Sequence, residues 1–178
     1  MADEGPVDMT SKEAKYEHLV NAYSSWLYRY AYWLAGDAAS AEDLVQETFL
    51  RAWRFLDSLQ DENAAKSWLT TILRRENARK YERKQLPMTD TDTDLVASSP
   101  TEFDNRIEAT ALRIALRELP EKYREPLILQ VLEGWSLDEI AAQFELPRNT
   151  VATRLHRARQ KLRAALEEES QKTAGDKH

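Results

Sequence analysis

Two segments of the sequence concentrate basic residues, which is the residue chemistry that binds nucleic-acid phosphates. Residues 66–84 carry seven Lys or Arg against two Glu, a net charge of +5. Residues 148–166 carry six Lys or Arg and no acid, a net charge of +6. Because the whole chain has a net charge of −6, the remaining residues are strongly acidic. This segregation predicts two separate phosphate-facing surfaces; the alternative is that both segments are ordinary solvated helix faces.

The second basic segment has the pattern of a helix that reads DNA. At about 100° per residue its apolar residues fall within one narrow arc, which must face a core. They are Val151, Leu155, Ala158 and Leu162. Side chains that point the other way are placed to meet base edges, and cations beside the arc are placed to contact phosphates. The first group is Asn149, Thr153, His156, Arg157 and Gln160, and the second is Arg148, Arg154, Arg159, Lys161 and Arg163.

The residues in front of this helix complete a predicted helix-turn-helix. Ser136 and Glu139 have the spacing of a capping box, which marks a helix start. A short helix with one apolar face follows, formed by Leu137, Ile140, Ala141 and Phe144. Residues 145–147 then make a tight connection to the basic helix. A short helix, a tight turn and a longer basic helix form the arrangement that enters the DNA major groove.

Three helices are predicted in the first half of the chain. The first runs from about Lys12 to Ala35 and stops at Gly36, and Ser40 is expected to cap the second. The apolar stripe of the second helix, which should be buried, is Leu44, Val45, Thr48, Phe49, Ala52, Phe55 and Leu56. Its opposite side carries Asp43, Gln46, Glu47, Leu50 and Arg54. The third helix begins near Ala64 and is expected to outrun its core with a basic end.

A segment without helical periodicity divides these helices from the rest. Residues 86–100 contain two prolines and alternate Thr with Asp, which is typical of a flexible linker. We therefore predict an all-α chain with a three-helix domain at 12–85 and a four-helix domain at 101–168. Residues 169–178 are polar and are predicted to form a disordered tail.

Composition argues against several other classes of protein. The chain has no Cys, and its three His lie too far apart in sequence to suggest a metal motif. No apolar run approaches the roughly 20 residues that span a bilayer, and the amino terminus lacks a secretion-signal pattern. A Gly-rich phosphate loop and a nucleophile motif are also missing. We expect a cytoplasmic protein without membrane insertion, metal, cofactor or enzymatic activity.

Three stretches together resemble an extracytoplasmic-function sigma factor, a small sigma type that gives bacterial RNA polymerase its promoter specificity. SAEDLVQETFLRAWRF (40–55) is similar to the helix that binds core polymerase, and SWLTTILRRENARKYERK (67–84) is similar to the adjoining helix that handles the −10 element. The stretch LPEKYREPLILQVLEGWSLDEIAAQFELPRNTVATRLHRARQKLR (119–163) resembles the domain that reads the −35 element. The resemblance covers about residues 15 to 166 and is interrupted by the linker.

The resemblance implies three sets of site residues. Binding of core polymerase falls to Asp43, Gln46, Glu47, Leu50 and Arg54. Contacts to −10 DNA fall to Asp61, Asn63, Arg74, Asn77, Lys80 and Tyr81. Contacts to −35 DNA fall to Arg148, Asn149, Thr150, Thr153, Arg154, His156, Arg157 and Arg159. On the third helix we expect Thr70, Arg74, Asn77 and Tyr81 to share an exposed side, with packing on the domain edge as the alternative for Tyr81.

The implied function is promoter-specific initiation with core RNA polymerase and promoter DNA as partners, and without catalysis by this chain. The resemblance also implies an anti-sigma factor, often membrane-bound, as a third partner that could hold the chain at the inner membrane. A polymerase-independent helix-turn-helix regulator would explain residues 134–166, but it leaves the Asp43 side and the first basic segment unexplained. The sequence departs from many relatives at Glu145, where they have Gly.

Overall fold

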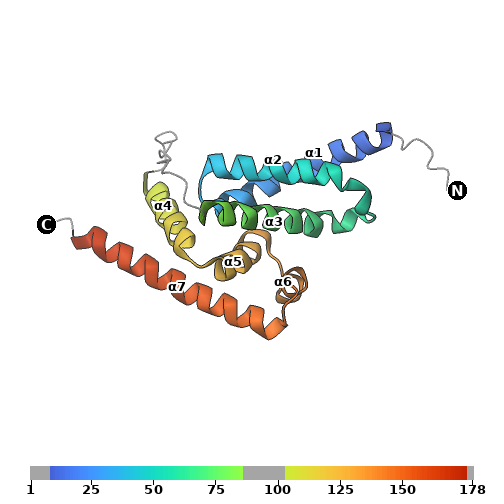
Figure 1. Ribbon diagram of the computed structural model, residues 1–178. Coiled ribbons are helices and arrows are strands. Elements are labelled where there is room, and N and C mark those ends of the chain that lie inside the picture. Colours follow the sequence, from blue (N-terminus) through green and yellow to red (C-terminus); the bar gives the residue numbers. More distant parts are fainter. Residues whose placement is uncertain (1–8, 86–102, 176–178) are drawn as a thin grey trace. The chain divides into compact units, whose positions relative to one another are not determined.

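The computed structural model describes residues 9–85 and 103–175, and all regular elements in these ranges are helical (Figure 1). They are α1 (Met9–Ala35), α2 (Ala38–Arg54), the short 3-10 helices η1 (Leu56–Ser58) and η2 (Glu62–Ala64), α3 (Ala65–Gln85), α4 (Phe103–Glu118), α5 (Glu121–Glu133), α6 (Leu137–Phe144) and α7 (Arg148–Gly175). The chain divides into two compact units between Arg83 and Lys84. The predicted all-α fold of two small helical domains is confirmed. The linker predicted at 86–100 lies outside the described residues.

The core of the first unit forms where α1 packs against α2. The buried residues of α1 recur at steps of three and four, as an amphipathic helix requires. They are Leu19, Trp26, Leu27, Tyr30, Ala31 and Leu34. The Tyr16 hydroxyl donates a hydrogen bond to the Phe49 carbonyl oxygen at 3.2 Å, and its ring lies edge-on to Trp53. Gly36 follows α1 with a positive φ of 87°, which confirms the predicted helix stop.

Helix α2 begins at a different residue from the one we expected. Its N-cap is Asp37, whose carboxylate accepts a hydrogen bond from the Ser40 amide at 2.7 Å. The expectation that Ser40 is the cap is therefore wrong by one turn, because Asp and Ser are both good caps and the sequence offers both. Most of the predicted stripe is buried, namely Leu44, Thr48, Phe49, Ala52 and Leu56, whereas Val45 is only half-buried.

Phe55 does not follow that stripe, because its side chain is 54% exposed. Helix α2 ends at Arg54, and Phe55 is its C-cap with a φ of −108°. The prediction assumed a helical turn of about 100° per residue through Phe55, but the helix ends one residue before it. The prediction that Phe55 is buried is therefore wrong.

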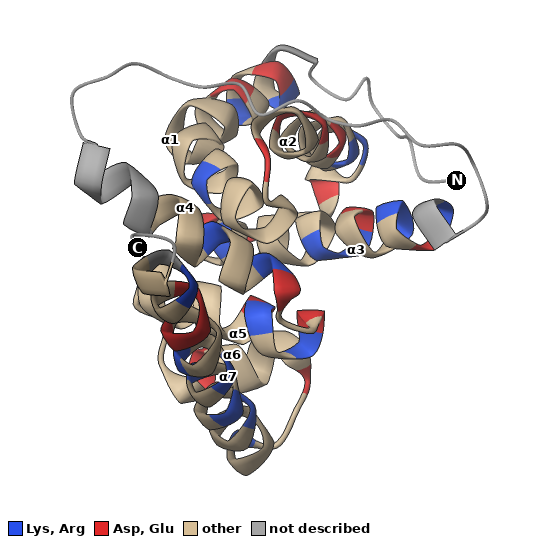
Figure 2. Ribbon diagram, turned by 90° about the vertical axis from the view of Figure 1, so that its left-hand side faces the viewer, with Lys and Arg blue, Asp and Glu red and all other residues tan. Residues whose placement is uncertain are grey.

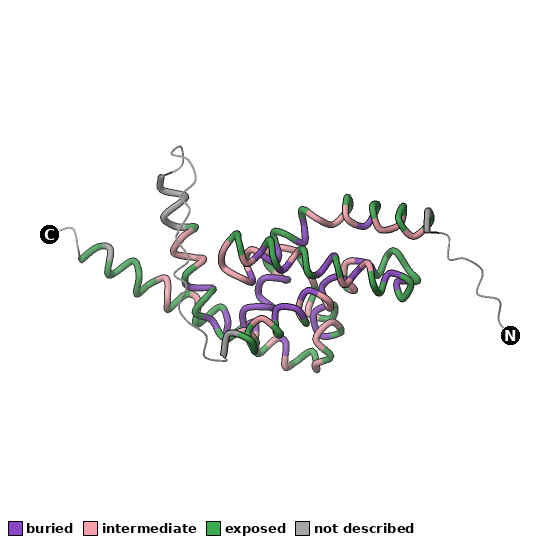
Figure 3. Tube along the Cα trace, turned by 45° about the horizontal axis from the view of Figure 1, so that its top comes forward, coloured by how far each residue is buried: buried purple, intermediate pink, exposed green. Residues whose placement is uncertain are grey.

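The second unit surrounds helix α5, in which every residue from Tyr123 to Leu129 is buried, including Pro126 (Figure 3). Helices α6 and α7 pack against α5, and α4 packs against α7. Helix α7 contributes Val151, Leu155 and Ala158 to this core, as its apolar arc predicted. Gly134 ends α5 in the left-handed conformation, with a φ of 66°.

The predicted helix-turn-helix is formed by α6 and α7. Its capping box is confirmed: the Glu139 amide donates to the Ser136 hydroxyl at 3.2 Å, and the Ser136 amide donates to the Glu139 carboxylate at 2.7 Å. Glu145 ends α6 with a φ of 53°, which is unusual for a residue other than Gly. Helix α7 then runs to Gly175, so the tail that we predicted to be disordered from residue 169 is helical up to that point.

Candidate partner and nucleic-acid interfaces

The outward side of α2 presents five exposed residues in one row, which we call the α2 ridge: Asp43, Gln46, Glu47, Leu50 and Arg54. Leu50 is 57% exposed, so an apolar side chain stands in water among polar neighbours. The sequence prediction that this side of the helix is unburied is confirmed. A row of acids, an amide and a central Leu can offer both ionic and apolar contacts to another protein.

One end of the α2 ridge is linked to α3. The Lys80 ammonium lies 3.9 Å from the Asp43 carboxylate, at the outer limit of an ion pair. The Asp43 side chain is 72% exposed, so solvent screens the attraction and the pair stabilises the fold little. This ion pair nevertheless joins a residue of the predicted polymerase-binding set to a residue of the predicted −10 set.

The side of α3 that we expected to face solvent is partly buried. Thr70 has no exposed surface and Asn77 is only 3% exposed, whereas Tyr81 is 38% exposed and Arg74 is half-buried. The expectation of one shared exposed side is therefore wrong. The buried stripe of α3 is wider than its apolar residues indicate, because Thr70 and Asn77 lie two turns apart on one side of it. The Thr70 hydroxyl donates to the Lys66 carbonyl at 2.8 Å, which satisfies it within the helix.

A buried carboxylate ties α3 to α2. The side chain of Glu76 is 10% exposed and forms ion pairs with Arg51 of α2 at 2.9 Å and with Arg79 of α3 at 3.1 Å. Two guanidinium groups therefore neutralise one buried carboxylate, which is the condition under which a buried charge is tolerated. Part of the positive charge counted on α3 is thus engaged within the protein.

The loop before α3 holds the remaining two residues of the predicted −10 set. Asp61 and Asn63 are both exposed, and the Asp61 carboxylate accepts a hydrogen bond from the backbone amide nitrogen of Asn63 at 2.9 Å. This bond makes Asp61 the N-cap of η2 and fixes the loop. The Asn63 side chain is left pointing away from the core.

Helix α7 presents the predicted base-reading residues to solvent. The exposed ones are Asn149, Thr153, His156, Arg157 and Gln160. Figure 2 shows Lys and Arg along the first turns of this helix and acids only toward its C-terminal end. The arrangement is therefore a buried apolar arc backed by a polar and basic outward side, which suits the major groove.

Several −35 residues already have partners within the chain. The Arg148 guanidinium lies 3.0 Å from the Asp138 carboxylate of α6, in an exposed ion pair. The Thr153 hydroxyl donates to the Asn149 carbonyl oxygen at 3.0 Å, and Arg159 donates to the Gln130 side-chain oxygen of α5. The Arg148 and Arg159 contacts join the N-terminal half of α7 to α6 and α5 before any ligand is bound, whereas the Thr153 bond lies within α7.

A cavity of about 220 Å³ lies between the start of α5 and the outward side of α7. Its lining residues are Lys122, Tyr123, Thr150, Thr153, Arg154 and Arg157. A hydrogen bond from Arg157, with help from the charge of nearby Lys122, lowers the pKa of Tyr123 below its usual value although burial opposes this. Sequence reasoning missed Lys122 and Tyr123, because they lie on a helix that it placed only by its apolar pattern.

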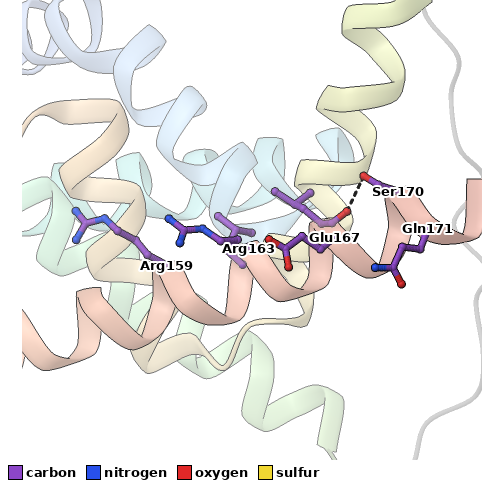
Figure 4. Close-up of a pocket in the computed structure, with 7 residues that line it drawn as sticks. Arg159, Arg163, Glu167, Ser170 and Gln171 are labelled. Carbon is purple, nitrogen blue, oxygen red and sulfur yellow. Dashed lines mark hydrogen bonds between the residues drawn. The ribbon is translucent and has the colours of Figure 1, made fainter. Parts of the chain in front are cut away.

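A second hollow, of about 610 Å³, follows the C-terminal half of α7 (Figure 4). Its polar lining mixes Arg159 and Arg163 with Glu167, and the Ser170 hydroxyl donates to the Leu166 carbonyl oxygen at 2.9 Å. Charges of both signs partly cancel here, so this hollow lacks the single-sign field of the smaller cavity.

Within the described residues, no group of three or more His, Asp or Glu side chains could hold a metal ion. In the same ranges no helix is long and apolar enough to cross a membrane.

Comparison with known proteins identifies the family. Residues 19–86 match Sigma-70 region 2, and residues 110–162 match Sigma-70 region 4. The ECF RNA polymerase sigma factor SigL of Mycobacterium tuberculosis is 35% identical over 157 residues, which are 84% of this chain and 88% of that protein. The chain belongs to the ECF RNA polymerase sigma factors. A second ECF sigma factor, SigE of Mycolicibacterium smegmatis, is 35% identical over 94% of this chain and 68% of its own length.

Two solved structures share the fold of this ECF sigma factor. The sigma factor RpoE of Bartonella quintana, solved in complex with the anti-sigma factor NepR, matches with a TM-score of 0.65 and 27% identity over 85% of this chain and 96% of its own. CnrH, solved with the cytosolic domain of CnrY, matches with a TM-score of 0.65 and 25% identity over 86% of this chain and 88% of its own. This ECF sigma factor thus acts with RNA polymerase in promoter-specific initiation, and a polymerase-independent regulator is not favoured.

Proposed function

We propose that the first unit binds core RNA polymerase through the α2 ridge, and that the second unit places α7 in the major groove of the −35 element. The chain itself catalyses no reaction. Its contribution is to position polymerase on promoter DNA and to hold the opened strand at the −10 element. The observation that carries this proposal is the combination of the exposed α2 ridge with an exposed basic side of α7 that contains no acid over residues 148–166.

Sequence reading at −35 falls to the outward side of α7. The side chains that can reach base edges are those of Asn149, Thr153 and His156, since they point away from the buried arc of the helix. Arg148, Thr150, Arg154, Arg157 and Arg159 complete the proposed −35 set. Cations at the flanks of a groove-bound helix contact phosphates and fix its register.

Capture of −10 DNA is proposed for the η2 loop and the accessible part of α3. Asp61, Asn63 and Tyr81 are exposed and can meet an unstacked base, while Arg74 and Lys80 supply positive charge. Asn77 belongs to the set that the family resemblance implies, but it is 3% exposed. We therefore place it among the residues that hold α3 in position, and a DNA contact by Asn77 requires α3 to shift.

An anti-sigma factor is proposed as a competing partner. The sigma factor RpoE, which resembles this chain, was solved in complex with the anti-sigma factor NepR. The exposed Leu50 in the α2 ridge offers an apolar contact to a partner of this kind. We propose a cytoplasmic location, with retention at the inner membrane when the anti-sigma factor is membrane-bound.

Association with sigma-free core polymerase tests the proposal. The double variant Asp43→Ala with Glu47→Ala should lose about tenfold or more in affinity for core, and run-off transcription should fall with it. The matched control is Glu13→Ala with Glu17→Ala, which removes two exposed acids from α1 at the same spacing. Equal core binding by both double variants, or no initiation by the unaltered chain on any genomic template, would refute the assignment.

A further inference from the structure

The cavity between α5 and α7 changes the interpretation of Arg157. From the helical pattern alone, Arg157 points outward with the residues expected to meet bases. In the structure it lines the same cavity as Lys122 of α5 and Arg154 of its own helix. Arg154 and Arg157 are one helical turn apart, so they reach the cavity from neighbouring positions. Three cations thus converge on about 220 Å³, and none of the lining residues is acidic.

Tyr123 provides a fixed anchor inside this group of cations. It is only 7% exposed, so packing in the core of the second unit fixes its ring. Arg157 lines the same cavity as Tyr123, and its guanidinium is close enough to lower the pKa of the phenol. The Lys122 ammonium lies 5.0 Å from the centre of the Tyr123 ring, within the range of a cation–π contact. A long Arg side chain held in this way loses less conformational freedom when it binds a ligand.

Convergent cations repel one another unless an anion lies between them. A phosphate group suits a cavity of this size and lining, because guanidinium groups, an ammonium group and the Thr150 hydroxyl can all donate to phosphate oxygens. The cavity borders the side of α7 that we assign to the major groove, and phosphates flank that groove on both strands. A phosphodiester of the DNA backbone is therefore the anion that arrives there when α7 binds.

We propose that Tyr123 is a positioning residue that directs Arg157 to a backbone phosphate beside the −35 element. This inference rests on the proposed function, since it needs α7 to bind DNA. Arg157 then sets the affinity of the second unit for DNA but does not choose the sequence. Base reading is left to Asn149, Thr153, His156 and their neighbours on the outward side.

The test uses the full chain and a labelled duplex of mixed sequence, with binding followed by fluorescence anisotropy over a series of salt concentrations. Arg157→Ala should weaken binding several-fold and lower the slope of log affinity against log salt by about 1, as expected for one lost phosphate contact. Tyr123→Phe keeps the ring and removes the hydroxyl, and it should cause part of the same loss. The double variant should bind no more weakly than Arg157→Ala alone, because the two residues act through one contact.

Two controls separate this role from a general effect of charge or fold. Lys172→Ala removes the same charge from the exposed last turns of α7, outside the cavity, and should leave the salt slope unchanged. His156→Ala should leave the slope unchanged but alter the sequences that the chain retains from a randomised duplex pool when it is assembled with core polymerase. Arg157→Ala should retain the same sequences as the unaltered chain.

Several outcomes would overturn the inference. Additive losses for Tyr123→Phe and Arg157→Ala would show that the phenol acts elsewhere, and an altered sequence preference for Arg157→Ala would return that residue to base reading. Inorganic phosphate that binds the unaltered chain but not Arg157→Ala, while the two chains bind the duplex equally, would assign the cavity to free phosphate. If the unaltered chain initiates transcription but the single and double variants do not behave as expected, only this inference is refuted. If the unaltered chain does not initiate, the proposed function is refuted as well.

Discussion

Helices α3 and α7 carry similar positive charge in the sequence, yet the structure uses that charge in different ways. On α3, Arg79 is paired with buried Glu76, and Lys80 lies 3.9 Å from Asp43. On α7 the stretch 148–166 contains no acid, and Arg157 reaches a cavity whose lining holds further cations. Helix α3 uses part of its positive charge in ion pairs within its own domain, whereas α7 presents its positive charge to solvent.

Net charge per segment therefore does not measure affinity for DNA. An Arg that neutralises a buried carboxylate cannot also bind a phosphate without a cost in stability. The second unit is therefore expected to supply most DNA contacts of the free chain, and α3 to contribute after polymerase has bound the α2 ridge. Because the chain as a whole is acidic, the free chain should bind DNA weakly at physiological salt.

The largest expected effect comes from breaking the charge cluster on α3. Glu76→Ala leaves two guanidinium groups facing each other at a buried site, so the first unit should lose about 2 kcal/mol of stability. The loss is smaller than for a fully buried pair, because the side chains of Arg51 and Arg79 are 32% and 48% exposed. Hydrogen exchange with mass spectrometry can measure the loss separately in α2 and α3.

Glu82→Ala is the matched control, since Glu82 is an exposed acid on the same helix. It should change the stability that hydrogen exchange measures in α2 and α3 by less than about 0.5 kcal/mol. Equal destabilisation by the two variants would mean that Glu76 is no more than a surface charge, and the contrast between α3 and α7 would be lost.

A second effect, of opposite sign, is expected in the other unit. Glu145 has a φ of 53°, a left-handed conformation that costs a residue with a Cβ about 1 kcal/mol. Glu145→Gly should therefore stabilise α6 and α7 by about 0.5 to 1 kcal/mol in urea unfolding, even though Gly loses more entropy on folding. Gly134→Ala is the mirror experiment: at a φ of 66°, with nothing within 4 Å of an added Cβ, it should destabilise by a similar amount through backbone strain alone.

The sequence predicted elements whose signals are local, and it missed positions where two local signals compete. The capping box of Ser136 and Glu139 was predictable, because both partners lie within one turn. Asp37 and Ser40 both suit an N-cap, and only the path of the chain after Gly36 selects Asp37. The unusual backbone at Glu145 was foreseen only through the Gly that many relatives have there.

Exposure of the candidate site residues was predicted correctly on helices with one buried side and incorrectly where packing involves polar residues. The α2 ridge and the outward side of α7 follow from apolar periodicity, and both are exposed. Burial of Thr70 and Asn77 could not be read from hydrophobicity, because polar side chains are buried only when tertiary partners satisfy them. The role of Tyr123 was hidden for the same reason, since it depends on the packing of α5 against α7.

A smaller effect should appear when Asp43 loses its charge. Asp43→Asn removes the attraction that holds Lys80 beside the α2 ridge, so the affinity of the free chain for DNA should rise about twofold, the size of an exposed ion pair. Glu47→Gln removes the same charge one turn away and should raise the affinity less. An equal rise for both variants in low-salt anisotropy would show that only net charge matters and that Lys80 is not restrained.

The smallest effect distinguishes the two units by half-buried Tyr16 and buried Tyr123. Burial raises the pKa of Tyr16, whereas the hydrogen bond from Arg157 lowers the pKa of Tyr123. The pKa of a tyrosine in the unfolded chain is about 10. Folded Tyr16 keeps its proton to a higher pH than that, so the free energy of unfolding of the first unit falls as the pH rises above about 10. Folded Tyr123 loses its proton at a lower pH than unfolded Tyr123. Its ionisation therefore stabilises the second unit fully above about pH 10, and it contributes nothing below the folded pKa of Tyr123. Tyrosinate absorbance of the unaltered chain, compared with that of Tyr16→Phe and of Tyr123→Phe, should show Tyr123 ionising at a lower pH than Tyr16. The reverse order would argue against the contact between the Tyr123 phenol and the Arg157 guanidinium, on which the contrast between the two units partly depends.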